Sequence, residues 1–472
     1  MLLLLAAVVV AAAQPASTTR WRAVASRERL LERAADSLLA RHVTAAGGGW
    51  AWRSAIQAPH YFTDRDVGAA GIAMGLLSAY HTTHRQEYLE GARRAGDWLL
   101  AVAQRTRAGG LRWPDWHDRR GVSDTHFTSF DDGAAGISDL LWRLGSATGD
   151  RRYKRGALAG MRWLSSEAKG LRGARCPRLC RWRYYDDAPD YRTGMGEGNA
   201  GIVHAFATFA QRTGKRWLER YALGGARYLE SRISPRGAIP ERVGGTEYDT
   251  GFLSGSAGDA FMFLSLYRQT HSPRWLADAE RLLTWVRSVG RPQRDGIAWP
   301  IEIDPREGGD RDLATGIEEG AAGIGWVELQ AYQVTRDPVD LRTAAGAGDW
   351  LFGNTRDELG GNAWPEDLGR PLVHTSLDNG APGIAWFLHD LALVTHDRDY
   401  EQAAHDARRW LRGVARTDAR GVYWPENGDG RRWRLTREPS WHWGTAGIVG
   451  FLARLRGWPI DMPGEEEGFG SR

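Results

Sequence analysis

Cysteine is scarce in this chain of 472 residues, and charge of one sign does not dominate it. The two cysteines, Cys176 and Cys180, lie close together in the segment CPRLC. No Cys or His pair follows at zinc-finger spacing, so we expect a small disulfide loop rather than half of a zinc site. The net charge is only +4, and no basic run is interleaved with aromatic residues. This balance excludes the charge pattern expected of a nucleic-acid-binding protein.

Long apolar runs are also missing, apart from the first residues, MLLLLAAVVVAAAQPAS. That run resembles the apolar region of a signal peptide with a cleavage site near Ala13, although no Lys or Arg precedes it. It is too short to span a bilayer comfortably. We expect a signal peptide at 1–14, export to the periplasm or the medium, and no membrane span in the mature chain. If the run is not a signal peptide, the location is cytoplasmic.

A tetrad of the form Gly-x-x-Gly, each time heading an apolar run, is what the chain has in abundance. It recurs at intervals of 65, 65, 57, 65, 60 and 64 residues. The tetrads begin at Gly68, Gly133, Gly198, Gly255, Gly320, Gly380 and Gly444. A repeat of this length indicates one closed or stacked array rather than several domains. We therefore expect a single domain over 15–460, followed by an acidic, glycine-rich tail at 461–472.

Each repeat joins two kinds of predicted helix. The first kind is amphipathic, with apolar residues at helical spacing, as in 27–42, 88–100 and 400–413. The second kind begins at the tetrad and has no strongly polar face, so it is expected to be buried on most sides. Seven outer and seven inner helices predict an all-α (α/α)7 toroid, in which the inner helices run parallel and their N-termini meet at one end.

The positions just before the tetrads should therefore face one shared cavity. Two residues before each tetrad the chain has Asp66, Asp131, Gly196, Leu253, Glu318, Asp378 and His442, which we call the axial tier. The following positions carry Val67, Asp132, Glu197, Ser254, Glu319, Asn379 and Trp443. Carboxylates crowded around one axis would raise one another's pKa values and allow acid–base pairs, or they could hold a hard cation. Each acid could instead simply cap a helix and oppose its dipole.

The long loops before the tetrads add a second recurrent motif, Trp-Pro followed by an acid in most copies. Its tryptophans could form platforms for a sugar ring or a peptide, or could merely close the rim of the toroid. The candidate catalytic residues are Asp131, Glu318, Asp378 and His442. The candidate substrate-binding residues are Trp113, Glu197, Trp299, Trp364, Trp424 and Trp443. No residue is assigned to a metal.

The seven tetrads and their spacing resemble those of the lanthionine synthetase C (LanC-like) family over nearly the whole mature chain. The resemblance implies an (α/α)7 toroid that adds cysteine thiols to dehydrated serine or threonine in a peptide. It also implies a zinc ion that activates the thiol and is held by one Cys and by a Cys-His pair before the next tetrad.

The chain departs from that family at the zinc ligands, because no cysteine precedes any tetrad. In the preferred register the ligand positions fall on Glu318, Asp378 and Asn379, and the family's earlier histidine falls on Ser254. A register shifted by one repeat uses Asp378, His442 and Trp443. An oxygen-rich set of this kind disfavours zinc, so thioether formation by the family's mechanism is not expected, and we predict no cofactor.

Three functions remain open at this point. The first is a divergent LanC-like protein, expected to be a monomer, that binds or modifies a peptide in its axial cavity. The second is a carbohydrate-active enzyme like the hairpin glycosidases, with two carboxyls acting as acid and base in an inverting hydrolysis. The third is a binding toroid without catalysis, in which the acids are only caps.

Overall fold

The computed structural model describes residues 29–57, 60–171, 176–303, 313–429 and 432–457. The predicted signal peptide at 1–14 and the predicted tail at 461–472 lie outside these residues. Within them, no helix combines the length and the apolar character needed to cross a membrane.

Seven inner helices begin directly after the first glycine of each tetrad, as predicted. They are α2 (Ala69–Thr83), α4 (Ala134–Thr148), α6 (Asn199–Thr213), α8 (Ser256–Thr270), α10 (Ala321–Thr335), α12 (Ala381–Thr395) and α14 (Thr445–Arg454). The residues of their first turns are all buried, which agrees with the absence of a polar face in the sequence.

Seven outer helices surround them. They are α1 (Leu30–Arg41), α3 (Gln86–Val102), α5 (Arg151–Glu167), α7 (Arg216–Glu230), α9 (Pro273–Val289), α11 (Pro338–Gly353) and α13 (Arg398–Val414). Each buries its apolar side toward the inner layer. In α3, for example, Tyr88, Ala92, Ala95 and Leu99 are buried while the charged residues between them face outward.

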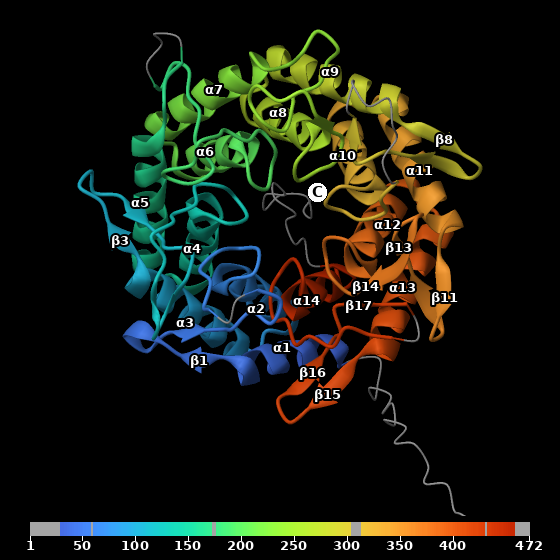
Figure 1. Cartoon of the computed structure of the whole chain (residues 1–472), viewed down its shortest axis with the longest axis horizontal. Coiled ribbons are helices and arrows are strands. Elements are labelled where there is room, and N and C mark those ends of the chain that lie inside the picture. Colours follow the sequence, from blue (N-terminus) through green and yellow to red (C-terminus); the bar gives the residue numbers. More distant parts are fainter. Residues whose placement is uncertain (1–28, 58–59, 172–175, 304–312, 430–431, 458–472) are drawn as a thin grey trace, which may run out of the picture.

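The array closes into a ring. Figure 1 shows the inner helices inside the outer ones, with the last helix, α14, lying beside α2 at the start of the chain. The first outer helix, α1, packs on α14 and so completes the seventh pair with a segment from the opposite end of the sequence. The predicted (α/α)7 toroid is confirmed.

The second glycine of every tetrad is required by packing. A side chain there would overlap the carbonyl oxygen of the residue six positions earlier, because the chain entering each inner helix folds back over its first turn. The pairs are Gly71 with Arg65, Gly136 with Phe130, Gly201 with Met195, Gly258 with Phe252, Gly323 with Ile317, Gly383 with Leu377, and Gly447 with Trp441. Close approach of backbones therefore explains why the repeat keeps this glycine.

Short strands in the loops were not predicted from the sequence. Five antiparallel hairpins follow outer helices: β1 (Val43–Thr44) with β2 (Trp50–Ala51), β3 (Gln104–Arg105) with β4 (Leu111–Arg112), β8 (Arg291–Gln293) with β9 (Gly296–Ala298), β11 (Arg356–Glu358) with β12 (Gly361–Ala363), and β15 (Arg416–Asp418) with β16 (Gly421–Tyr423). The remaining strands are β5 (His117–Asp118) with β6 (Gly121–Val122), β7 (Tyr248–Asp249) with β10 (Glu302–Ile303), and the sheet of β13 (Pro365–Asp367), β14 (Arg370–His374) and β17 (Asn427–Gly428). The last two sheets join loops of neighbouring repeats.

Candidate functional site at the converging helix ends

The seven residues of the axial tier are joined by their backbones into one closed ring. The N–H of each donates to the carbonyl of its counterpart in the next repeat, at 2.9–3.4 Å, and His442 donates to Asp66 to close the circle. The order is Asp66, Asp131, Gly196, Leu253, Glu318, Asp378, His442 and again Asp66. The helix N-termini therefore converge as predicted, and side chains far apart in the sequence are brought to one place.

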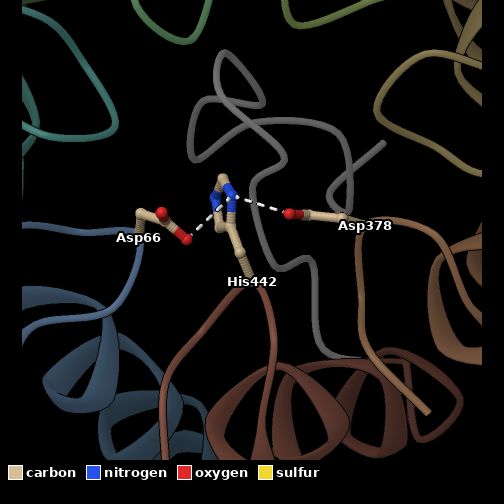
Figure 2. A group of neighbouring side chains, drawn as sticks. All are labelled: Asp66, Asp378 and His442. Carbon is tan, nitrogen blue, oxygen red and sulfur yellow. Dashed lines mark ion pairs between the residues drawn. The ribbon is translucent and has the colours of Figure 1, made fainter. Parts of the chain in front are cut away.

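His442 lies at the centre of this arrangement, with three carboxylates around its ring. Its Nδ1 is 3.2 Å from Asp378 Oδ2 and 3.6 Å from Asp66 Oδ1, and its Nε2 is 3.6 Å from Asp131 Oδ1. Figure 2 shows the imidazole between Asp66 and Asp378, which approach it from opposite sides. The predicted residues Asp131, Asp378 and His442 thus form one cluster, and Asp66 joins them although it was not among the four candidates.

Arg65 fixes the position of Asp131. Its Nη1 donates to Asp131 Oδ1 at 3.0 Å, and both side chains are buried. The guanidinium also lies over the rings of Phe130 and Trp441, at 5.1 and 5.8 Å from their centroids. A buried arginine held between two aromatic rings has little freedom to leave its carboxylate.

The crowding shifts the pKa values of the cluster. Burial lowers the pKa of His442, but the Asp378 and Asp131 carboxylates outweigh burial, and the pKa lies well above its usual value. Burial raises the pKa of Asp66 well above its usual value although the His442 charge opposes this. For Glu318, burial and the Asp378 charge act in the same direction and also raise the pKa well above normal. Protons are therefore held tightly at the centre of the ring.

Further acids occupy the positions directly after the axial tier in the sequence. Burial and the Asp131 charge raise the pKa of Asp132 to about 6, while a hydrogen bond donated by the Tyr184 hydroxyl, at 2.9 Å, opposes the shift. Burial and the Asp249 charge raise the pKa of Glu319 to about 8. Glu197 is half exposed and ion-paired with Arg192.

Hydrogen bonds that cap the inner helices do not account for the acids of the axial tier. The N-cap residue of every inner helix is the first glycine of the tetrad, and no side chain caps it. Asp131 pairs with Arg65 instead. An acid from outside the tier, Asp64, accepts hydrogen bonds from the N–H groups of Val67 and Gly68 at 2.7 and 2.8 Å, just before α2. The acids of the axial tier therefore make no capping hydrogen bond at these N-cap residues, and their opposition to the helix dipoles stays a prediction.

The tryptophans of the Trp-Pro motif have a structural position. Trp113, Trp299, Trp364 and Trp424 are at most 4% exposed, and each indole N–H donates to a carbonyl in the last turn of the preceding outer helix at 2.8–2.9 Å. They offer no free ring face, so the prediction that they form substrate platforms does not agree with the structure. Trp443 differs, because it is only partly buried beside His442.

The two cysteines lie away from the tier. Cys176 and Cys180 are bonded to each other, as expected, and the loop hydrogen-bonds to Gly224 of the outer helix α7. Among the described residues, no cysteine thiolate therefore lies at the axial tier.

A family model described as lanthionine synthetase C-like protein matches residues 126–372 and, in a second alignment, 190–458. The chain belongs to the LanC-like family. The two matches begin about one repeat apart, which is the offset between the two registers in which the zinc-ligand positions can be read. Comparison with curated protein sequences gives no match.

Solved structures of several other proteins have the same fold as this LanC-like protein. Nisin cyclase is 11% identical over 85% of this chain and 92% of its own, with a TM-score of 0.58. A D-mannose isomerase is 11% identical over 93% and 99%, with a TM-score of 0.52. A family 76 glycoside hydrolase from a bovine Bacteroides thetaiotaomicron strain is 12% identical over 92% and 78%, with a TM-score of 0.50. At these identities the likeness establishes the toroid and leaves the activity open.

The zinc site implied by the LanC-like family does not fit this chain. Glu318, Asp378 and Asn379 offer only oxygen atoms or an amide nitrogen where two thiolates and an imidazole are expected. Ser254 stands at the position of the earlier histidine, and its backbone N–H and hydroxyl bond to Glu319. No step of the chemistry is therefore assigned to a thiolate-bound zinc ion.

Proposed function

We propose that this LanC-like protein binds a peptide over the axial tier and acts on it with the tier's carboxyl and imidazole groups. The observation that carries the proposal is the closed backbone ring, which brings His442 within 3.2–3.6 Å of Asp66, Asp131 and Asp378. Carboxyl and imidazole groups gathered in one place are suited to proton transfer with a bound substrate.

The substrate we propose is a basic peptide segment. Asp66, Asp132, Glu197 and Glu318 are all partly exposed around the tier, and Leu253 and Trp443 add partly exposed apolar surface beside them. Acids crowded in this way are stabilised in their charged form by a cation from outside. A lysine or arginine side chain, or a free amino terminus, supplies that charge, while the apolar residues accept the rest of the segment. The shared cavity that the sequence predicts in front of the axial tier stays a prediction.

The test is a binding titration at pH 7.5 with labelled peptides of equal length and opposite charge. We expect the basic peptide to bind more tightly than the acidic one, and Asp132→Asn and Glu197→Gln each to weaken it roughly three- to tenfold, because partly exposed charge pairs contribute about 1 kcal/mol. Glu87→Gln, on the outer helix α3, is the control and should leave binding unchanged. Equal binding of both peptides, or no effect of either tier variant, would sink the proposal.

A carbohydrate-active enzyme is the second candidate, and one contrast favours it. Asp131 is ion-paired with Arg65, whereas the adjacent Asp132 accepts from Tyr184 and has a pKa raised to about 6 by burial and by the Asp131 charge. Acid–base hydrolysis of a glycoside needs two carboxyls in different surroundings, and these two differ in that only Asp131 has an arginine partner. Turnover of an oligosaccharide that disappears in Asp131→Asn, in a protein that binds neither peptide, would favour this candidate over the first.

A further inference from the structure

Three side chains of the axial tier direct ligand atoms toward a common point. Asp66, Asp378 and His442 each offer one atom, and these atoms all lie within 4.8 Å of one another. The two closest approaches, from His442 Nδ1 to Asp378 and to Asp66, are 3.2 and 3.6 Å. Donors that share a metal ion at about 2.0–2.2 Å lie roughly 3–4 Å apart. The spacing therefore suits an ion placed between the three (Figure 2).

The carboxylate oxygens at this point face the His442 ring but form no well-aligned hydrogen bond. Asp66 Oδ1 and Asp378 Oδ2 are buried, and among the described residues each is ion-paired with His442 Nδ1, at 3.6 and 3.2 Å, without the geometry of a hydrogen bond. Asp378 is only 3% exposed. A bound cation would take the place of the His442 proton and would contact both carboxylate oxygens directly, which would recover the free energy that a poorly satisfied buried oxygen costs. The missing hydrogen bonds are a second indication, besides the spacing, that the point between these residues suits a cation.

The other nitrogen of the His442 imidazole also faces a carboxylate. His442 Nε2 faces Asp131 Oδ1 at 3.6 Å, and Asp131 is held by Arg65 at 3.0 Å. A ligating histidine usually directs its other nitrogen to a carboxylate, which fixes the ring and makes it a better ligand. Asp131 stands where such a carboxylate is needed.

We propose that Asp66, Asp378 and His442 bind a divalent metal ion that accepts oxygen and nitrogen ligands, with Mn²⁺ and Zn²⁺ as the ions to test. Two carboxylates and one imidazole form a harder donor set than two thiolates and one imidazole. One ligand, Asp66, comes from the first repeat, so the site exists only because the ring closes. It lies at the same tier as the proposed peptide site but does not depend on any peptide being bound.

The experiment uses the full chain after removal of metals with a chelator. Titration with MnCl₂ and with ZnCl₂, together with elemental analysis, should give one ion per chain for at least one metal. Asp66→Asn and Asp378→Asn should each weaken binding at least tenfold, whereas Asp124→Asn, an exposed aspartate in the loop before α4, should not. Co²⁺ is the spectroscopic probe, and His442→Gln should change its visible absorption bands because a nitrogen ligand is lost.

Absence of saturable binding of either metal to the wild-type chain would overturn the proposal, as would one ion per chain in both aspartate variants. Circular dichroism of the metal-free variants separates loss of a ligand from loss of the fold. If Asp378→Asn does not fold, the partly exposed Asp66→Asn still decides the question. Peptide binding is measured in parallel on the metal-free chain. Metal binding without peptide binding contradicts only the proposed function, and peptide binding without metal binding contradicts only the metal site.

Discussion

Glu319 shows how a single carboxyl group beside the axial tier links folding to pH. Burial, supported by the Asp249 charge, raises its pKa to about 8 from the usual 4.5, and hydrogen bonds from Ser254 only partly oppose this. Between these two values the folded chain keeps a proton that the unfolded chain has lost. Stability contributed by this proton is complete below about pH 4.5 and is lost as the pH rises through 8.

We therefore predict that Glu319→Gln reduces the loss of stability between pH 4.5 and 8.5. An amide mimics the protonated acid at every pH, so the difference in unfolding free energy between the two ends of this range should shrink by on the order of 3 kcal/mol. Thermal unfolding across the range measures the effect. Some pH dependence should remain, because burial and the Glu241 charge also raise the pKa of Asp249, to about 7. Glu87→Gln, at an exposed carboxyl, should leave the profile unchanged, and an unaltered profile in Glu319→Gln would contradict the assignment.

The position of a residue within the repeat predicted part of the site but not all of it, and single residues show the physical reasons. Asp131, Asp378 and His442 were grouped correctly because equivalent positions of a closed repeat must meet. Asp66 holds the same position and could have been included on that signal alone. Arg65 has no counterpart in the other repeats, so no pattern pointed to it. A Trp-Pro motif has the same sequence whether its indole faces a ligand or a helix end, and the hydrogen bond from the indole to the preceding outer helix shows which applies here.

At the scale of the element, the tetrad is a device for starting an inner helix under a folded-back chain. The first glycine forms the N-cap in extended conformation, and the second lies against a carbonyl oxygen of the chain that has just entered. The spacing of these glycines predicted all seven inner helices. The strands of the loops were missed because most are two or three residues long, too short for alternation to appear in the sequence.

The same change, glycine to alanine within a helix, should have opposite consequences at two positions. In Gly258→Ala of α8 the new methyl group would overlap Phe252 O, a backbone atom that cannot move aside, so we expect a loss of about 2–3 kcal/mol or more. In Gly346→Ala of α11 the methyl group would lie 3.0 Å from Ile297 Cγ2, and the better helix propensity of alanine, worth up to about 1 kcal/mol, offsets the tight contact. Denaturant unfolding midpoints compare the two, and equal effects would contradict the packing argument.

For the whole molecule, ring closure depends on a link that differs from the others. In the first six repeats a threonine three residues before the axial tier donates to a loop carbonyl of the next repeat, as Thr250 does to Pro300 at 2.7 Å. The seventh repeat has Pro439 at this position and has no hydroxyl to give. Its neighbour Glu438, only 2% exposed, accepts instead from Ser54 Oγ at 3.1 Å and from the N–H groups of Ala55 and Ile56 at 2.6 and 3.2 Å. One carboxyl group thus joins the end of the chain to its beginning.

Glu438→Ala should therefore loosen both ends of the chain together. The buried Ser54 hydroxyl and the partly exposed N–H groups of Ala55 and Ile56 would lose this acceptor, which costs about 1–3 kcal/mol, and the ring would open most easily at this seam. Hydrogen exchange should accelerate at 54–57 and at 438–447 in parallel, although these segments lie at opposite ends of the sequence. Thr250→Val, which removes one link inside the ring, is the matched control and should accelerate exchange only near 250 and 300. If exchange at 54–57 stays unchanged in Glu438→Ala, the first and last repeats are held together by the packing of α1 and α2 on α14, and this carboxyl does not close the ring.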